Sequence, residues 1–166
     1  DWVVTWALGH LVELAPPQHY NEGWKRWTLK DLPMLPSELD ETVIEESKDQ
    51  FDVIKNLLSR SDISSVVIAT DAGREGELVA RWILKLSDYQ GKMERLWISS
   101  QTEKAIKEGF MSLKPSSEYD NLYAAASCRA AADWYVGMNV TRALTCTHDA
   151  KLSAGRVQTP TLALMT

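Results

Sequence analysis

Features that mark membrane-spanning, secreted and zinc-binding proteins are scarce in this sequence of 166 residues. No apolar run approaches the ~20 residues that cross a bilayer, and no basic segment followed by an apolar one opens the chain. The two cysteines, Cys128 and Cys146, have neither CxxC nor zinc-ligand spacing, so we expect reduced, buried thiols. These absences predict a soluble, cytoplasmic protein without a membrane partner.

Positive charge is also in short supply. The chain has 18 Lys and Arg against 23 Asp and Glu, a net charge of −5. Non-specific binding to duplex DNA depends on neutralising phosphates with Lys and Arg, so this balance disfavours such binding and leaves room only for a local nucleic-acid site. The apolar share of 45% is enough for one domain, or for one domain and part of a second.

The order of helices and strands predicts an α/β fold followed by an all-helical segment. Val66 to Ala69 is short, apolar throughout and mostly β-branched, as expected of a parallel strand covered on both faces. Ser100 to Glu103 has the spacing of a capping box. Alternating helices and strands favour parallel strands with right-handed crossovers. The expected elements are a strand or strand-turn unit in residues 1–14, an ordered loop in 18–36, helices in 42–60, 75–85 and 103–113, strands in 64–70 and 95–98, and helices in 119–144 and after Pro160.

The segment Asp71 to Glu77, DAGREGE, places three carboxylates where a strand ends and a helix begins, the edge at which sites collect in open α/β sheets. Asp71, Glu75 and Glu77 could converge on Mg²⁺ through oxygen ligands and retained waters. Alternatively, Asp71 caps the helix and both glutamates favour its positive N-terminus, an effect of only ~1 kcal/mol. The turn is no phosphate-binding loop, because its glycines fit neither GxGxxG nor a Walker sequence.

The longer stretch VVIATDAGREGELVARWIL, residues 66–84, resembles the Toprim signature of the type IA DNA topoisomerases, in which a strand ends in a DxDxE track. The resemblance puts Asp71 at the first acidic position and Glu75 at the third. It implies that these two are catalytic and bind Mg²⁺, with Glu77 as a further metal ligand. Gly73 stands where many relatives have the middle Asp, in a version that resembles the bacterial topoisomerase III branch, so the number of bound Mg²⁺ ions stays open.

The start of the chain also resembles this family. Residues 4–14 are similar to its VTWALGHLVEL sequence, whereas the family's earlier Glu-Lys-Pro-Ser-like sequence does not occur. For His10, a single histidine, a structural role is the favoured interpretation. Because the chain stops at Thr166 within an expected helix, we interpret it as a piece of a longer protein. The resemblance implies a Rossmann-like Toprim domain with a mostly parallel sheet in residues 1–115, lacking its first strand, and the beginning of a helical DNA-binding domain in residues 116–166.

Basic residues with a possible DNA contact lie on either side of Pro115. Arg129 and Asp133 are four residues apart on one helix face and could form an ordinary surface ion pair. Their surroundings resemble the family's Arg-x-x-x-Asp-Trp-x-x-Gly-x-Asn-x-Thr-Arg pattern, which implies that they hold the DNA backbone near the active site. Arg95 matches a position where relatives place a basic residue close to the scissile site, although arginine is also common at strand ends. Trp134 could stack on single-stranded bases, but core packing is favoured.

The segment LSAGRVQTPTLA, residues 152–163, resembles the family's SxGRVQ sequence at the start of a helix. The small residues from Ser153 to Gly155 would let a phosphate approach the backbone N–H groups, while Arg156 and Gln158 supply directional donors. By itself the segment could equally be a glycine-containing loop and helix N-cap. Its position after the two preceding motifs follows the family's order.

The resemblance implies an enzyme that depends on Mg²⁺ but not on ATP, cleaves one DNA strand through a tyrosine linked to the 5′ phosphate, and reseals it, relaxing or decatenating DNA. Implied partners are single-stranded DNA, or DNA with single-stranded regions, and a RecQ-like helicase. We expect a monomer in the bacterial cytoplasm, associated with the nucleoid. None of the five tyrosines lies in the family's Arg-Thr-Asp neighbourhood, so the chain by itself is expected to be inactive. Another Toprim enzyme, a primase or nuclease, and a noncatalytic nucleic-acid- or protein-binding module remain alternatives.

Overall fold

The computed structural model describes residues 2–165. They form two compact units, one made of the residues up to Glu13 together with Glu41–Ser127, the other of Leu14–Asp40 together with the residues from Cys128 onward. Helix α5 (Asp120–His148) contributes its first turns to the first unit and its remainder to the second. Among the described residues, no helix combines the length and the apolar character needed to cross a membrane.

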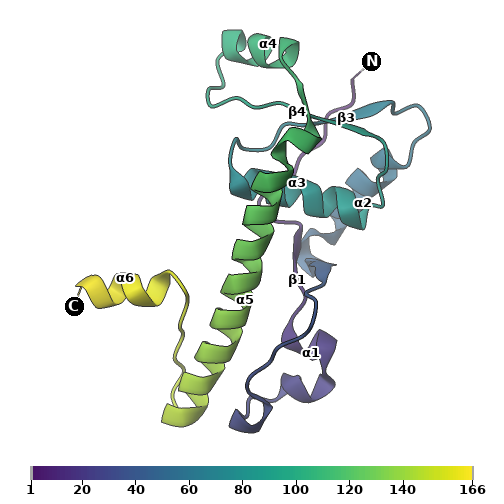
Figure 1. The fold of residues 1–166 in the computed structure, drawn as a ribbon. Coiled ribbons are helices and arrows are strands. Elements are labelled where there is room, and N and C mark those ends of the chain that lie inside the picture. Colours follow the sequence, from purple (N-terminus) through teal and green to yellow (C-terminus); the bar gives the residue numbers. More distant parts are fainter. Residues whose placement is uncertain (1, 166) are drawn as a thin grey trace. The chain divides into compact units, whose positions relative to one another are not determined.

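The first unit is built on a three-stranded sheet. β3 (Ser65–Ile68) pairs in parallel with β4 (Lys92–Arg95), which pairs antiparallel with the short β5 (Lys114–Pro115). Parallel neighbours need a crossover, here α3 (Arg74–Leu86). In Figure 1, α3 and α2 (Lys48–Leu58) lie on one side of β3 and β4, and α4 (Glu103–Met111) lies on the other. The predicted α/β fold with parallel strands is confirmed.

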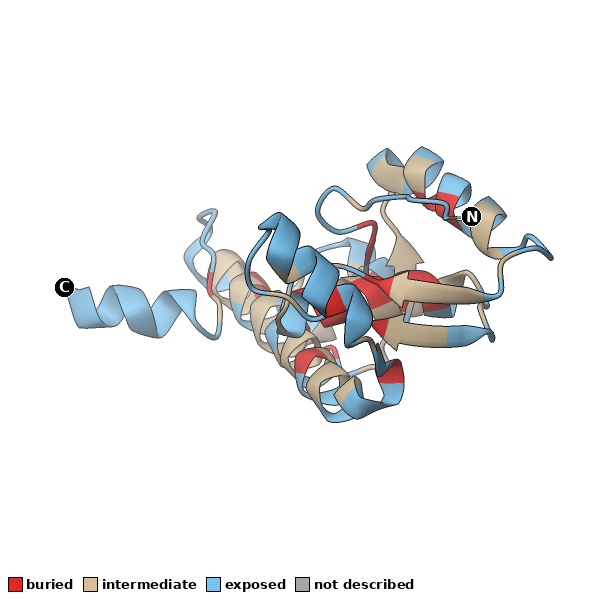
Figure 2. Ribbon diagram, turned by 90° about the horizontal axis from the view of Figure 1, so that it is seen from above, coloured by how far each residue is buried: buried red, intermediate tan, exposed pale blue. Residues whose placement is uncertain are grey.

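The core of this unit forms where α3 covers the sheet. Ile68 of β3 packs against Ala80 and Leu84 of α3, with partly buried apolar side chains around them. Figure 2 shows the buried residues gathered at the strands and the helices beside them. Burial of each such leucine or isoleucine contributes roughly 1.5–3 kcal/mol, so the packing of α3 fixes the turn that precedes it. A separate two-stranded sheet pairs β1 (Val12–Leu14) with β2 (Glu41–Val43).

The second unit packs an irregular segment against α5. This segment contains α1 (Pro17–Tyr20) and the 3₁₀ turns Glu22–Lys25 and Leu29–Asp31. Trp134 is buried and its Nε1 donates a hydrogen bond to the Ala15 carbonyl at 2.9 Å. Asn139 accepts from the Met34 N–H at 2.7 Å and donates to its carbonyl at 3.0 Å. The ordered loop expected for residues 18–36 therefore owes its order to α5, and Trp134 serves core packing, as favoured from the sequence.

The helical segment expected after Pro115 is confirmed. It consists of the 3₁₀ turn Ser116–Tyr119, α5 and α6 (Gln158–Met165). Every described residue of α6 is exposed, and Figure 2 shows this helix in pale blue throughout.

The strand-turn unit expected in residues 1–14 is present as a turn at Gly9, whose φ is +73°, followed by a strand in residues 12–14. Two other local predictions were wrong. The helix predicted for 42–60 begins at Lys48, after β2 and the 3₁₀ turn Glu45–Ser47. The second parallel strand spans 92–95 rather than 95–98, because its register is set by pairing with β3.

Two predictions about single side chains also failed. Helix α4 is capped by Thr102, whose Oγ1 accepts from the Ala105 N–H at 3.3 Å, and not by Ser100. Both cysteines are free, but Cys128 is exposed and Cys146 half-buried. The expected burial of the thiols is wrong because the alanine-rich helix α5 turns Cys128 away from the side that carries the buried Ala126 and Trp134.

Candidate functional site

The acidic turn, residues 71–77, joins the carboxyl end of β3 to the first turn of α3. Thr70 Oγ1 donates to the Gly76 carbonyl at 2.7 Å, and the Gly73 N–H donates to the Asp71 carbonyl at 2.9 Å. A Cβ on Gly76 would lie closer than 3.0 Å to three backbone atoms of Asp71, so a side chain has no room there. The backbone around Asp71 is therefore closely packed on both sides.

Two of the three carboxylates lie at the surface of this turn. Asp71 and Glu75 are exposed and line one cavity of about 510 Å³ together with His10. His10 Nε2 lies 4.0 Å from Glu75 Oε2, and their side chains are 45% and 60% exposed. The rest of the lining is chiefly apolar and comes from the N-terminal segment (residues 5–9), α2, β3 with the residues that follow it, and α3. Two carboxylates and one imidazole thus share a solvent-accessible edge of the sheet.

The donor chemistry of this edge fits a hard cation. Mg²⁺ prefers oxygen ligands and keeps several waters, so one or two protein carboxylates can hold it. Within residues 2–165, no three His, Cys, Asp or Glu side chains are arranged to hold a metal ion. Asp71 and Glu75 would therefore supply a small part of the coordination shell, which leaves positions for water or phosphate oxygens.

Glu77, the third carboxylate, points into the protein interior and is 0% exposed. Its Oε1 accepts from Arg81 Nε at 2.8 Å and its Oε2 from Arg95 Nε at 3.0 Å. A desolvated carboxylate needs such charge partners. Both oxygens are engaged, so in this structure Glu77 does not face the cavity edge, although its sequence motif predicts a metal ligand.

Arg95 is also 0% exposed, which places its guanidinium out of reach of a phosphate in this structure. Burial lowers the pKa of Arg95 below its ordinary value, while the neighbouring Glu77 raises it. An arginine stays protonated under these opposing influences. The side chain is thus a buried cation that pairs with Glu77, a placement that differs from the expected contact with DNA.

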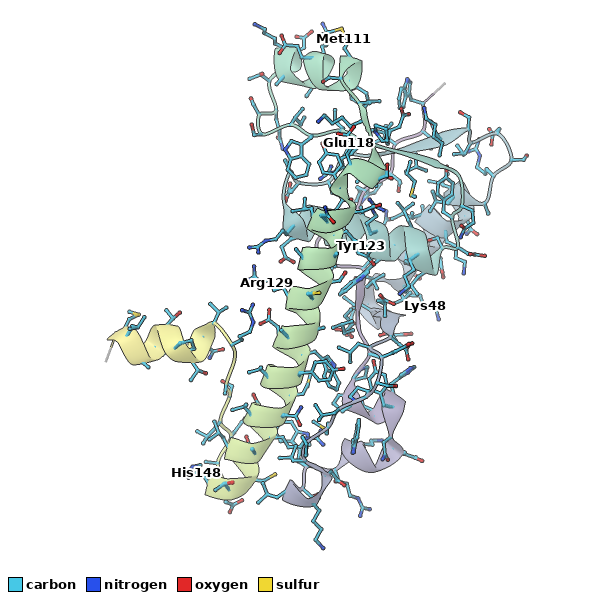
Figure 3. The ribbon with its side chains drawn as sticks, viewed as in Figure 1. Lys48, Met111, Glu118, Tyr123, Arg129 and His148 are labelled. Carbon is cyan, nitrogen blue, oxygen red and sulfur yellow. The ribbon has the colours of Figure 1, made fainter. Side chains whose placement is uncertain are left out.

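The other predicted DNA-binding residues come together in the second unit. Arg156 Nε donates to Asp133 Oδ1 at 2.9 Å, and Arg129 Nε lies 3.7 Å from Asp133 Oδ2. Arg129 is labelled on α5 in Figure 3. Gln158 Nε2 donates to Ser153 Oγ at 3.5 Å. Two guanidinium groups share one carboxylate, so this cluster keeps a net positive charge at a surface where each of the three side chains is about 40% exposed.

Sequence reasoning overlooked Arg81. This residue donates to Glu77, to the Ser116 carbonyl at 2.5 Å and to Asp120 Oδ1 at 2.8 Å. Its guanidinium carbon lies 5.6 Å from the ring centroid of Tyr123, which Figure 3 labels on α5. The four-residue spacing between Glu77 and Arg81 was the available signal, because such pairs face one another on a helix.

Two protein-family models match this chain, one over the part that holds the acidic turn and one over the part that holds the Arg129, Asp133 and Arg156 cluster. Residues 2–101 match the family model of the Toprim domain. The chain belongs to the Toprim family. Residues 117–166 match the family model described as DNA topoisomerase. The acidic turn lies in the first match and the Arg129, Asp133 and Arg156 cluster in the second.

Relatives extend the similarity over the whole chain. A protein named DNA topoisomerase 3 from Shouchella clausii is 58% identical over 164 residues, which is 99% of this chain and 22% of the relative. Proteins of the same name from Bacillus cereus and Bacillus subtilis are each 56% identical, over 99% of this chain and 22% and 23% of their own lengths. The chain thus spans less than a quarter of these relatives, and the resemblance to the type IA DNA topoisomerases is confirmed.

Proposed function

We propose that this chain is the part of a type IA DNA topoisomerase that binds Mg²⁺ and holds the DNA backbone near the cleavage site. The observation that carries the proposal is the pair of exposed carboxylates, Asp71 and Glu75, at the carboxyl end of β3 within the Toprim match. The second match, over residues 117–166, favours a topoisomerase over a primase or nuclease that has a Toprim domain alone.

The parent protein would cleave one DNA strand through a tyrosine that this chain does not supply, form a link to the 5′ phosphate, and reseal the strand without ATP. Asp71 and Glu75 would hold Mg²⁺, with Glu77 bound to Arg81 and Arg95 instead. When bound, Mg²⁺ supplies positive charge against phosphate oxygens. Glu75, which is exposed and lies close to His10, would accept and return the proton of the 3′ oxygen.

Arg129 and Arg156 would hold backbone phosphates, since each keeps exposed N–H donors beside Asp133. Ser153 of the loop before α6 and Gln158, the first residue of α6, which are joined by a hydrogen bond, would add directional donors. Single-stranded DNA, or DNA with single-stranded regions, is the proposed substrate. A monomeric state, a cytoplasmic location at the nucleoid and a RecQ-like helicase partner belong to the same proposal, on the strength of the family resemblance alone.

We also propose a domain boundary near Pro115, with a metal-binding domain in residues 1–115 and the start of a DNA-binding domain in residues 116–166. The two family matches, which end at residue 101 and begin at residue 117, support it. The compact units divide the chain differently, because Leu14–Asp40 packs with the later part of α5.

Removal of the metal tests the proposed function. The full-length parent protein should relax negatively supercoiled plasmid in the presence of Mg²⁺, lose this activity in EDTA and regain it when Mg²⁺ is restored, with or without ATP. Gel electrophoresis of the plasmid measures the change. If the intact, folded parent neither relaxes nor nicks plasmid in Mg²⁺, the noncatalytic binding module replaces this proposal.

Arg156→Gln tests the proposed DNA contact. Loss of one phosphate contact should weaken binding of a single-stranded oligonucleotide several-fold and flatten the slope of log K against log salt by about 0.7. Fluorescence anisotropy of the parent protein at several salt concentrations measures both quantities. Arg60→Gln is the control, because Arg60 is similarly exposed and also pairs with an aspartate, Asp62. Equal affinities and slopes for both variants would remove Arg156 from the interface.

A further inference from the structure

We infer that Arg95 is a positioning residue that fixes the geometry of the acidic turn through the backbone, and does not contact DNA. The inference rests on the proposed function, because it concerns the metal site at Asp71 and Glu75. Its basis is the set of contacts made by one fully buried side chain.

The Arg95 guanidinium joins the three segments that meet at the turn. It forms hydrogen bonds to the end of β3 and the residue just before the turn, to the first residue of the turn, to the first helical turn of α3, and to the residue that follows its own strand β4. The acceptors are the carbonyl oxygens of Ile68 at 3.0 Å, Thr70 at 2.8 Å, Asp71 at 2.6 Å and Leu96 at 2.9 Å, and the Glu77 carboxylate at 3.0 Å. No lysine could replace this arrangement, because a single ammonium cannot span acceptors that a planar guanidinium reaches with three nitrogens.

These contacts act on both proposed metal ligands. The hydrogen bond to the Asp71 carbonyl fixes the peptide group that joins Asp71 to the next residue, and with it the backbone that carries the Asp71 side chain. The bond to Glu77 fixes the first turn of α3, where Glu75 lies. Arg95 therefore links the two carboxylate-bearing segments without touching either exposed carboxylate.

Neighbouring side chains leave Arg95 little freedom to move. Arg81 binds the other oxygen of Glu77 and is itself held by the Ser116 carbonyl and Asp120. The Trp97 ring centroid lies 5.0 Å from the Arg95 guanidinium carbon. Glu77 is thus held by two cations, and Arg95 by Glu77, Trp97 and four carbonyls, which is the kind of support that keeps metal ligands in place.

Arg95→Lys in the full-length parent protein tests this role, because it keeps the positive charge and removes the planar guanidinium group that reaches several acceptors at once. Binding of Mn²⁺, followed by electron paramagnetic resonance of the free ion, should weaken by about tenfold. Binding of single-stranded DNA in EDTA should stay within about twofold of wild type, because no phosphate contact is lost. Arg142→Gln is the burial-matched control: Arg142 is 3% exposed, lies in the second unit, and its loss should leave Mn²⁺ affinity unchanged.

Each result separates the inference from the proposed function. Weaker DNA binding with unchanged Mn²⁺ affinity would identify Arg95 as a phosphate contact and overturn the inference. If Asp71→Asn abolishes Mn²⁺ binding while Arg95→Lys matches wild type, only the inference fails. If wild type binds Mn²⁺ no better than Asp71→Asn, the proposed metal site itself fails.

A second variant covers the case in which Arg95→Lys unfolds. Arg95→Met combined with Glu77→Leu removes the buried charge pair together, and such replacements often preserve stability. Circular dichroism should show a folded protein, and its Mn²⁺ affinity should still be about tenfold weaker, because the carbonyl anchors are gone. Wild-type Mn²⁺ affinity in this folded double variant would mean that Arg95 merely balances the Glu77 charge, and would overturn the inference.

Discussion

Asp71→Asn is expected to lower the rate of plasmid relaxation by the full-length parent protein by about two to three orders of magnitude at a fixed Mg²⁺ concentration. Asparagine keeps the shape of the side chain but removes one unit of negative charge from a site with two exposed carboxylates. Metal-ion charge contributes several kcal/mol to catalysis, and each 1.4 kcal/mol corresponds to about tenfold in rate.

The rate should be measured over a range of Mg²⁺ concentrations. A shift of the curve to higher Mg²⁺ would show weakened metal binding, and a lower plateau would show an added effect on the chemical step. Asp62→Asn is a suitable control, because Asp62 is an exposed aspartate that pairs with Arg60 away from the turn. Wild-type relaxation by Asp71→Asn at every Mg²⁺ concentration would place the chemistry elsewhere.

Gly76→Ala is expected to have the second-largest effect. The added methyl group would overlap the Asp71 backbone, so the turn or the start of α3 must move. Overpacking of this kind costs about 1–3 kcal/mol in unfolding free energy. A displacement of about 1 Å at a reacting group lowers rates by about 100-fold, so relaxation should fall even where the protein is still folded.

Gly73→Ala is the matched control, three residues earlier in the same turn. A Cβ on Gly73 meets nothing within 4 Å, and its φ of −179° is extended backbone that any residue adopts. Its unfolding free energy should stay within about 0.5 kcal/mol of wild type. Thermal unfolding and plasmid relaxation, measured in parallel for both variants, check the difference. Equal behaviour of the two variants would show that close packing against Asp71 is unimportant.

The sequence determined the parts of this protein that depend on local pattern. The β-branched run that becomes β3, the amphipathic helix α3 and the turn between them were predicted because periodicity and turn residues are local properties. The family followed from motifs that are contiguous in the chain. The burial of one glutamate could also have been predicted from the sequence. Glu75 and Glu77 lie about 200° apart around a helix, so when one face of that helix packs against the protein, only one of them can face solvent.

Only the tertiary structure decided which groups meet across the chain. Glu77 pairs with Arg95 because β4 lies beside β3 in a register that ends both strands at the same edge of the sheet. Asn139 forms hydrogen bonds with the backbone of Met34, 105 residues away, because Leu14–Asp40 packs against α5. Spacing along a chain carries no information about such partners, whereas burial demands them: a desolvated carboxylate needs a cation, and buried carbonyls need donors. The same demand places Arg95 in the interior and leaves Asp71 and Glu75 at the surface.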